Sequence, residues 1–292
     1  MTGGEAAARK RRLVVVAPAR SLPREAVEPV RRVAASLYGD AVSVDFRDQC
    51  FLSKGHFAGS DVARTEAFVE AANDPAADAV WFARGGYGAG RFAPDVIERL
   101  GPSARAKKYL GYSDTGFLLA RLYAAGVGQP AHGPMPADAL REGGEAAIAR
   151  ALKWLVEEDE ASLEPTCGPD APPRVAFNAI VLAHALHAAQ SLDLSGHVLM
   201  IEEVAEHLYA FDRSIGAVLS SRAARDLAGV RLGRVLDIPE NEPRFDQTPQ
   251  EIVRFWCDRV GAPFLGSADI GHDAANKVVP FGRTRLARSV NV

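Results

Sequence analysis

Along the first half of the chain, short apolar runs alternate with longer segments in which apolar and polar positions have a helical pattern. Short apolar runs at 13–17, 41–46 and 79–82 are typical of buried strands, and the segments 24–38 and 62–72 between them have helical patterns. Strands that alternate with helices favour a parallel sheet with helices on both faces. The pattern therefore predicts an α/β fold in which any active site lies at the carboxyl ends of the strands.

A break in this pattern divides the chain. A helix is predicted over 145–157, and the stretch 163–173 that follows contains prolines and a glycine that suppress regular structure. We expect an N-terminal α/β domain, a linker and a smaller C-terminal mixed α/β domain, at residues 1–157, 158–173 and 174–292.

The second half has its own regular elements. Residues 180–190 look helical, and 198–201 form a short apolar run that predicts a strand. A further helix is predicted over 249–260, with Thr248 as its N-cap and Pro249 at its first position.

A serine occupies the apex of a predicted turn at residues 108–116, where an apolar strand runs into the helix 114–125. A Gly-x-Ser-x-Gly turn is the familiar signature of hydrolases, but here the second glycine comes one residue late, at Gly116. The alternative is that Ser113 only caps the helix, because serine accepts a hydrogen bond well at that position. The turn alone leaves both interpretations open.

A second strand-to-loop junction supports a catalytic role for Ser113. The strand 79–82 ends in the glycine-rich loop 83–90, whose glycines let a substrate lie against backbone N–H groups. This loop and Ser113 both follow predicted parallel strands, so they share one edge of the sheet. A hydroxyl beside N–H donors suggests acyl transfer. The loop lacks the Gly-x-Gly-x-x-Gly and Gly-Lys-Ser/Thr patterns of nucleotide sites.

The order of short motifs along nearly the whole chain resembles the LD-carboxypeptidases, which are serine peptidases that trim murein tetrapeptides and include microcin-immunity enzymes. The motifs are LVVVAP (13–18), FAGSD (57–61) with Arg64, ARGGYG (83–88), GYSD (111–114), HGP (132–134), IEEVAE (201–206), Tyr209 with Asp212 and Arg213, GH (271–272) and PFG (280–282). The resemblance implies an N-terminal sheet of the flavodoxin-like or class I amidotransferase-like kind.

The resemblance also implies a catalytic triad of Ser113, Glu202 and His272. His272 would take the serine proton during attack, and Glu202 would orient the imidazole and stabilise its cation. The N–H of Asp114 and one N–H from Gly85 or Gly86 are the implied oxyanion donors. Each such donor contributes roughly 3 kcal/mol to the transition state.

Two departures from the family pattern bear on this site. The chain has Glu202-Glu203 where the family has Glu-Asp, so the resemblance alone assigns Glu202 to the histidine. It also has Ala-Phe before Asn178 where the family has two glycines, which bears on a substrate-binding role for Asn178. A carboxypeptidase must bind the terminal carboxylate of its substrate, and a guanidinium can do so. Arg84 and Arg213 are the candidates. The alternative for either residue is a buried ion pair.

Composition and sequence patterns exclude several kinds of partner. A net charge of −3 predicts no nucleic-acid partner, and no apolar run has membrane-spanning length. No His-Glu-x-x-His pattern marks a metal site, so neither metal nor cofactor is expected. His132 is expected to be structural, bonded to backbone. Three cysteines without Cys-x-x-Cys pairing, and an N-terminal apolar run too short for a signal peptide, predict a cytoplasmic protein.

By resemblance, the chain is expected to hydrolyse the bond before the terminal D-alanine of murein tetrapeptides during cell-wall recycling. Two alternatives stay open. One is a microcin-immunity type of amidase, and the other is a small-molecule binding module without catalysis. The resemblance also suggests a homodimer, although nothing in the composition indicates one.

Overall fold

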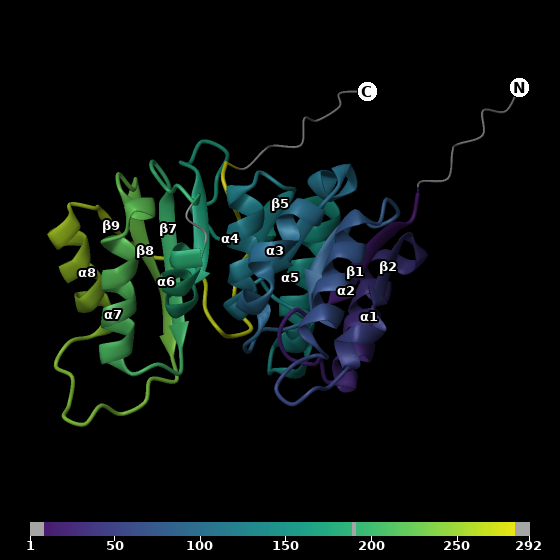
Figure 1. The fold of residues 1–292 in the computed structure, drawn as a ribbon, viewed down its shortest axis with the longest axis horizontal. Coiled ribbons are helices and arrows are strands. Elements are labelled where there is room, and N and C mark those ends of the chain that lie inside the picture. Colours follow the sequence, from purple (N-terminus) through teal and green to yellow (C-terminus); the bar gives the residue numbers. More distant parts are fainter. Residues whose placement is uncertain (1–8, 189–190, 284–292) are drawn as a thin grey trace, which may run out of the picture.

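Two sheets built almost entirely of parallel strands lie side by side in the molecule (Figure 1). The computed structural model describes residues 9–188 and 191–283. The first sheet has the strand order β10-β5-β4-β3-β1-β2 and the second has the order β6-β7-β8-β9. The predicted α/β fold is therefore confirmed.

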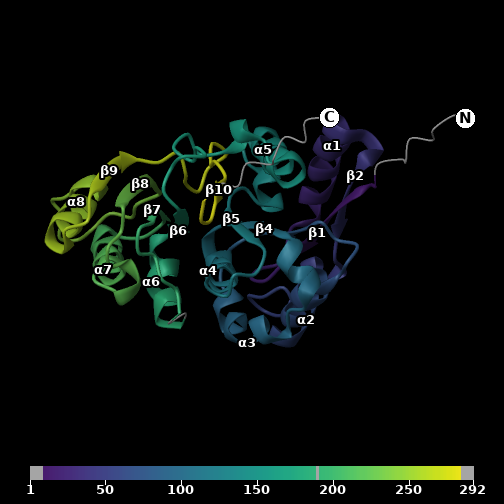
Figure 2. The same cartoon turned by 90° about the horizontal axis from the view of Figure 1, so that it is seen from above.

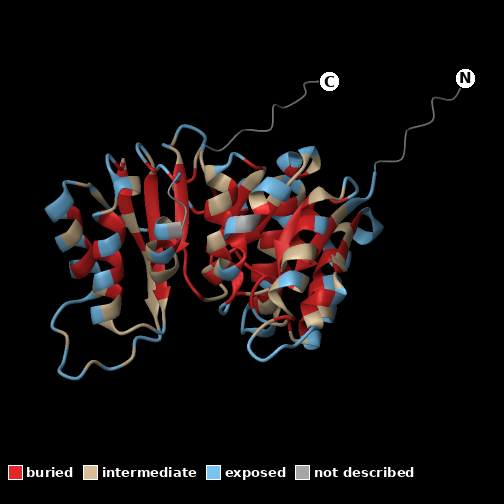
Figure 3. Ribbon diagram, in the orientation of Figure 1, coloured by how far each residue is buried: buried red, intermediate tan, exposed pale blue. Residues whose placement is uncertain are grey.

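The strands of the first sheet are β1 (Arg11–Val16), β2 (Val42–Phe46), β3 (Ala79–Phe82), β4 (Lys108–Gly111), β5 (Gln129–His132) and β10 (Val279–Pro280). Those of the second sheet are β6 (Arg174–Asn178), β7 (Val198–Val204), β8 (Gly229–Leu236) and β9 (Phe264–Ser267). Among the pairings that the structure describes in the first sheet, only that of β10 with β5 is antiparallel. Central strands such as β3 are buried on both faces, which explains why they read as continuous apolar runs (Figure 3).

Helices cover both faces of the first sheet (Figure 2). One face carries α1 (Val27–Tyr38) and α5 (Gly144–Glu157), and the other carries α2 (Asp61–Asn73), α3 (Ala93–Val96) and α4 (Gly116–Ala124). The helices of the second half are α6 (Ala179–Ala188), α7 (Leu208–Leu219) and α8 (Pro249–Val260). Helices α4 and α6 pack against each other and join the two halves. In the part of the chain that the structure describes, no helix is both long and apolar enough to cross a membrane.

Several predicted boundaries differ from those observed. The predicted helix 24–38 begins with a separate 3-10 turn, Arg24–Ala26, which directly follows Pro23. The predicted strand 198–201 continues to Val204, through two glutamates. These carboxylates are tolerated in a buried strand because each has a hydrogen-bonding partner. Helix α8 begins as predicted, with Thr248 and Glu251 forming a reciprocal capping box.

The last described strand returns to the first sheet. After β9 the chain leaves the second sheet, passes through a loop that contains His272, and pairs as β10 with β5 so that Val279 lies opposite His132. In Figure 2 this yellow segment lies between β5 and β6, which agrees with the contacts that β10 makes with both strands. The pairing holds the loop beside the carboxyl end of β4.

Candidate active site

Ser113 lies at a strained turn directly after β4. Its φ is 59°, in the left-handed region that residues other than glycine rarely adopt, and it begins the 3-10 turn Ser113–Thr115 that leads into α4. The N-cap positions of this turn and of α4 belong to Tyr112 and Thr115. The alternative in which Ser113 serves as the helix cap is therefore wrong, and the hydroxyl is presented at the edge of the sheet.

The glycine loop meets this turn directly, since β3 and β4 are neighbouring parallel strands. A Cβ at Gly85 would lie 2.7 Å from both the Cβ and the Oγ of Ser113, and 3.6 Å from the backbone nitrogen of Asp114. Only a residue without a side chain fits such an approach. The structure thus brings together the Gly85 backbone, the serine hydroxyl and the amide that follows it.

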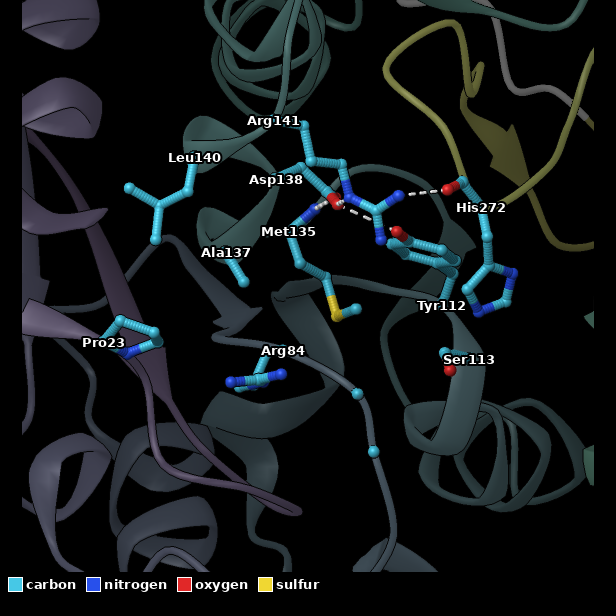
Figure 4. Close-up of a pocket in the computed structure, with 12 residues that line it drawn as sticks. Pro23, Arg84, Tyr112, Ser113, Met135, Ala137, Asp138, Leu140, Arg141 and His272 are labelled. Carbon is cyan, nitrogen blue, oxygen red and sulfur yellow. Dashed lines mark hydrogen bonds and ion pairs between the residues drawn. The ribbon is translucent and has the colours of Figure 1, made fainter. Parts of the chain in front are cut away.

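His272 and Glu202 form a buried pair at the same edge. The Nδ1 atom of His272 is 2.5 Å from Oε2 of Glu202, and the side chain of Glu202 is fully buried. The other ring nitrogen, Nε2, is buried and has no hydrogen-bonding partner among the described residues. Ser113 and His272 line one pocket, and in Figure 4 this side of the imidazole faces Ser113. The geometry leaves Nε2 free to accept a proton.

The neighbouring glutamate points elsewhere, as the alternation of side chains along a strand requires. Glu203 accepts hydrogen bonds from the Asn178 side chain and, at 2.9 Å, from the backbone N–H of Ile180. Burial raises the pKa of Glu203 to about 7, against the effect of these hydrogen bonds. The acid that faces His272 is therefore Glu202.

The electrostatics of the pair favour an imidazolium. Burial, the largest effect, lowers the pKa of His272, but the charge of Glu202 and its hydrogen bond outweigh burial, and the resulting pKa lies above the ordinary value. The cation that would form during proton transfer is thereby stabilised.

This shift predicts the pH dependence of any reaction in which His272 acts as the base. If His272 acts as a base it must be neutral, and a raised pKa delays its deprotonation to higher pH, so kcat/KM should rise through a midpoint above about 6.5. A series of kcat/KM measurements from about pH 5 to about pH 9 tests this expectation. A flat profile would contradict a histidine base, and a midpoint below the ordinary value would contradict the dominance of Glu202.

The pocket has a volume of about 260 Å³. In Figure 4, Ser113 and His272 lie on one side and Arg84 lies on the other. It is lined by Pro23, Arg84, Gly85, Gly86, Tyr112, Ser113, Met135, Ala137, Asp138, Leu140, Arg141 and His272.

The sequence analysis did not identify two residues that line this pocket, Asp138 and Arg141. Asp138 accepts hydrogen bonds from the Tyr112 hydroxyl at 2.9 Å and from the Met135 N–H at 2.8 Å, and forms an ion pair with Arg141. Arg141 in turn donates to the carbonyl oxygen of His272. The only sequence signal was that these residues follow closely after the His-Gly-Pro motif at 132–134. Together they fix the backbone of the histidine loop.

Arg84 is a cation without a carboxylate partner among the described residues. It is partly buried, its Nη1 donates to the Ser21 carbonyl at 3.3 Å, and its buried Nε has no partner. Burial lowers the pKa of Arg84, and the nearby charges of Arg20 and Arg141 act in the same direction. A pocket with this excess of positive charge suits an anionic group.

Three other predicted residues lie away from this pocket. Asn178 is buried, and its side-chain amide donates a hydrogen bond to Glu203. Arg213 is exposed on α7, and its guanidinium lies 5.7 Å from the centroid of the Tyr209 ring. Neither lines the pocket. His132 is buried and its Nε2 lies 3.0 Å from Oδ1 of Asn276, so its partner is a side chain instead of the expected backbone. Burial lowers the pKa of His132 to about 4, which suits a neutral structural residue.

Chelation of divalent metals should leave activity unchanged. Within residues 9–188 and 191–283, no three histidine, cysteine or carboxylate side chains gather as a metal-binding group, and a serine triad needs no metal. Activity is to be measured before and after prolonged incubation with EDTA. Loss of activity that added zinc restores would contradict a metal-free mechanism.

The two halves of this α/β chain each match a domain of one protein family. Residues 13–133 match the LD-carboxypeptidase N-terminal domain, and residues 175–285 match the LD-carboxypeptidase C-terminal domain. The chain belongs to the LD-carboxypeptidase family.

Individual relatives agree with this membership. The murein tetrapeptide carboxypeptidase of Pseudomonas aeruginosa is 28% identical over 295 residues, covering 94% of this chain and 92% of the relative. The muramoyltetrapeptide carboxypeptidase of Oxalobacter formigenes has a TM-score of 0.73 at 21% identity, covering 92% and 93% of the two chains. The microcin C7 self immunity protein MccF, in complex with aspartyl sulfamoyl adenosine, has a TM-score of 0.74 at 16% identity, covering 94% and 92%. The two structural likenesses show a shared fold.

Proposed function

We propose that this protein is a serine LD-carboxypeptidase that releases the terminal D-alanine of murein tetrapeptides. The observation that carries the proposal is the His272–Glu202 pair. Nε2 of His272 has no hydrogen-bonding partner among the described residues, and His272 lines the same pocket as Ser113. A murein tetrapeptide carboxypeptidase among the relatives supports the choice of substrate.

The proposed reaction proceeds in two stages. The Oγ of Ser113 attacks the carbonyl carbon of the scissile bond while Nε2 of His272 takes the hydroxyl proton, and the carbonyl oxygen becomes an oxyanion. The C–N bond then breaks, and the same proton passes to the leaving amine of D-alanine. Water next attacks the acyl carbon while His272 takes one of its protons. The bond between that carbon and Oγ of Ser113 then breaks, His272 returns the proton to Oγ, and the shortened peptide leaves.

Each further group supports one step of this mechanism. No hydrogen bond joins Ser113 to His272 among the described residues, and such bonds commonly form only when substrate is bound. The amides of Asp114 and of Gly85 or Gly86 are proposed to bind the oxyanion. Arg84 is proposed to bind the terminal carboxylate of the substrate, since it lines the pocket without an acidic partner.

The substrate is tested by incubation with murein tri-, tetra- and pentapeptides, with released D-alanine measured by mass spectrometry. Cleavage of the tetrapeptide alone is expected, and Ser113→Ala is the inactive control. An aminoacyl sulfamoyl adenosine is assayed in parallel. Cleavage of that compound instead of the tetrapeptide would favour the microcin-immunity type of reaction, while no cleavage and no labelling of Ser113 by a covalent serine probe would favour a binding module.

We also propose that the enzyme acts in the cytoplasm. Cys50, Cys167 and Cys257 are all buried and none forms a disulfide, which suits a reducing compartment. Fractionation of cells that express the natural gene, followed by immunoblotting, tests this location.

A further inference from the structure

The side chain of Asp114 has a role that the triad does not use. It is almost fully buried behind the nucleophile turn, and its Oδ2 accepts a hydrogen bond of 2.7 Å from the backbone N–H of Ala89. The side chain of Asp114, the residue after Ser113, thus binds the backbone of the glycine loop at Ala89, near the loop's carboxyl end.

Arg64 holds the same point of the loop from α2. Its buried Nη1 donates to the carbonyl of Gly88 at 2.7 Å and also to the carbonyl of Pro18, which follows β1. Gly88 has a φ of 141°, and a Cβ there would lie 2.7 Å from that same Nη1. The peptide group that joins Gly88 to Ala89 is therefore held on its N–H side by Asp114 and on its carbonyl side by Arg64.

The loop needs such an anchor. Between Arg84 and Ala89 the chain contains three glycines, which restrict the backbone least of all residues. Its near end is fixed by β3, where the N–H of Ala83 donates to Val16 at 2.8 Å. Oxyanion donors contribute to catalysis only when they are held in place before the charge develops.

We propose that the Asp114 carboxylate is a positioning residue that fastens the glycine loop to the nucleophile turn, so that the amides of both segments face one point above Ser113. This inference rests on the proposed function, because it assigns a role in stabilising the oxyanion of that reaction. Burial raises the pKa of Asp114 to about 6, while its hydrogen bonds and the charge of Arg64 act in the opposite direction. Near neutral pH both oxygens are therefore mostly available as acceptors.

Two substitutions separate this role from general stability. Asp114→Asn keeps the shape and one acceptor oxygen, whereas Asp114→Leu keeps similar bulk and has no acceptor. The matched control is Asn73→Leu, because Oδ1 of Asn73 accepts the N–H of Gly101 at 2.7 Å in a loop that does not line the pocket. All three proteins are first compared with the wild type by melting temperature.

The first readout is hydrogen exchange of the backbone amides in residues 84–91, which needs no substrate. Exchange is expected to be fastest in Asp114→Leu, intermediate in Asp114→Asn, and unchanged in Asn73→Leu. Unchanged exchange at Ala89 in both Asp114 variants would overturn the proposal. This outcome is decided even if the tetrapeptide proves not to be the substrate.

The second readout is kcat and KM on the tetrapeptide. Loss of ordered oxyanion donors should lower kcat by about 100-fold or more in Asp114→Leu, and by roughly threefold to tenfold in Asp114→Asn, with KM little changed. A folded Asp114→Leu with wild-type kcat would overturn the inference, and if that variant fails to fold, a wild-type kcat in Asp114→Asn does so. A wild-type enzyme that does not cleave the tetrapeptide would instead refute the proposed function, and hydrogen exchange would still decide the anchor.

Discussion

Replacing Glu202 with glutamine is expected to lower kcat for tetrapeptide cleavage by about 10⁴-fold, the scale seen when the acid of a serine triad becomes an amide. A neutral amide cannot stabilise the imidazolium, and it can hold His272 in the wrong tautomer. Glu203→Gln should retain most of the activity, because Glu203 bonds to Asn178 and Ile180 and has a pKa of about 7. At neutral pH it is already partly uncharged.

The two variants control for each other, since both change a buried carboxylate of β7 to its amide. We would measure kcat/KM against pH for each, together with the melting temperature. The activity that remains in Glu202→Gln should have a lower midpoint than the wild type, because the charge that raises the pKa of His272 is gone. An inactive Glu203→Gln beside an active Glu202→Gln would show that the acid is Glu203.

Gly85→Ala is expected to lower kcat by about 100-fold to 1,000-fold, comparable to the loss of an oxyanion donor. The new methyl group would lie 2.7 Å from both side-chain atoms of Ser113, closer than such atoms approach. Either the serine turn or the loop must move, and each movement separates the hydroxyl from its neighbouring amides.

The control for this substitution is Gly168→Ala, where a Cβ meets no atom within 4 Å and φ lies outside the left-handed region. That variant should keep wild-type kcat and a melting temperature close to the wild type. Reaction with a covalent serine probe reports separately on Ser113 in both variants. If Gly85→Ala reacts and turns over as fast as the wild type, the close approach of loop and turn has no catalytic importance.

The sequence was most informative where local chemistry decides the structure. The run 79–82 matches β3, and Thr248 with Pro249 starts α8, because a buried strand and a capping box each have a signature within a few residues. The edge shared by Ser113 and the glycine loop was also predictable, since parallel strands align their carboxyl ends.

Long-range contacts account for what the sequence did not indicate. Val279 and Pro280 are too few to read as a strand, and their pairing with β5 depends on the sheet being present. Asp138 and Arg141 carry no motif, and Arg64 belongs to a motif that gave it no role. Their contacts with Tyr112, His272 and Gly88 exist only in the folded chain. The resemblance had already assigned Glu202 instead of Glu203 to the histidine, and the orientation of β7 agrees with that choice.

The antiparallel pairing of β10 with β5 imposes an order on biosynthesis. Ser113 and the strands β1 to β5 are synthesised before His272. The imidazole is held beside Ser113 only after β10, which follows His272 in the chain, has paired with β5. A nascent chain that ends before β10 carries the hydroxyl without its base. If His272 is the base of the reaction, hydrolysis therefore begins only after β10 has been synthesised and has paired with β5.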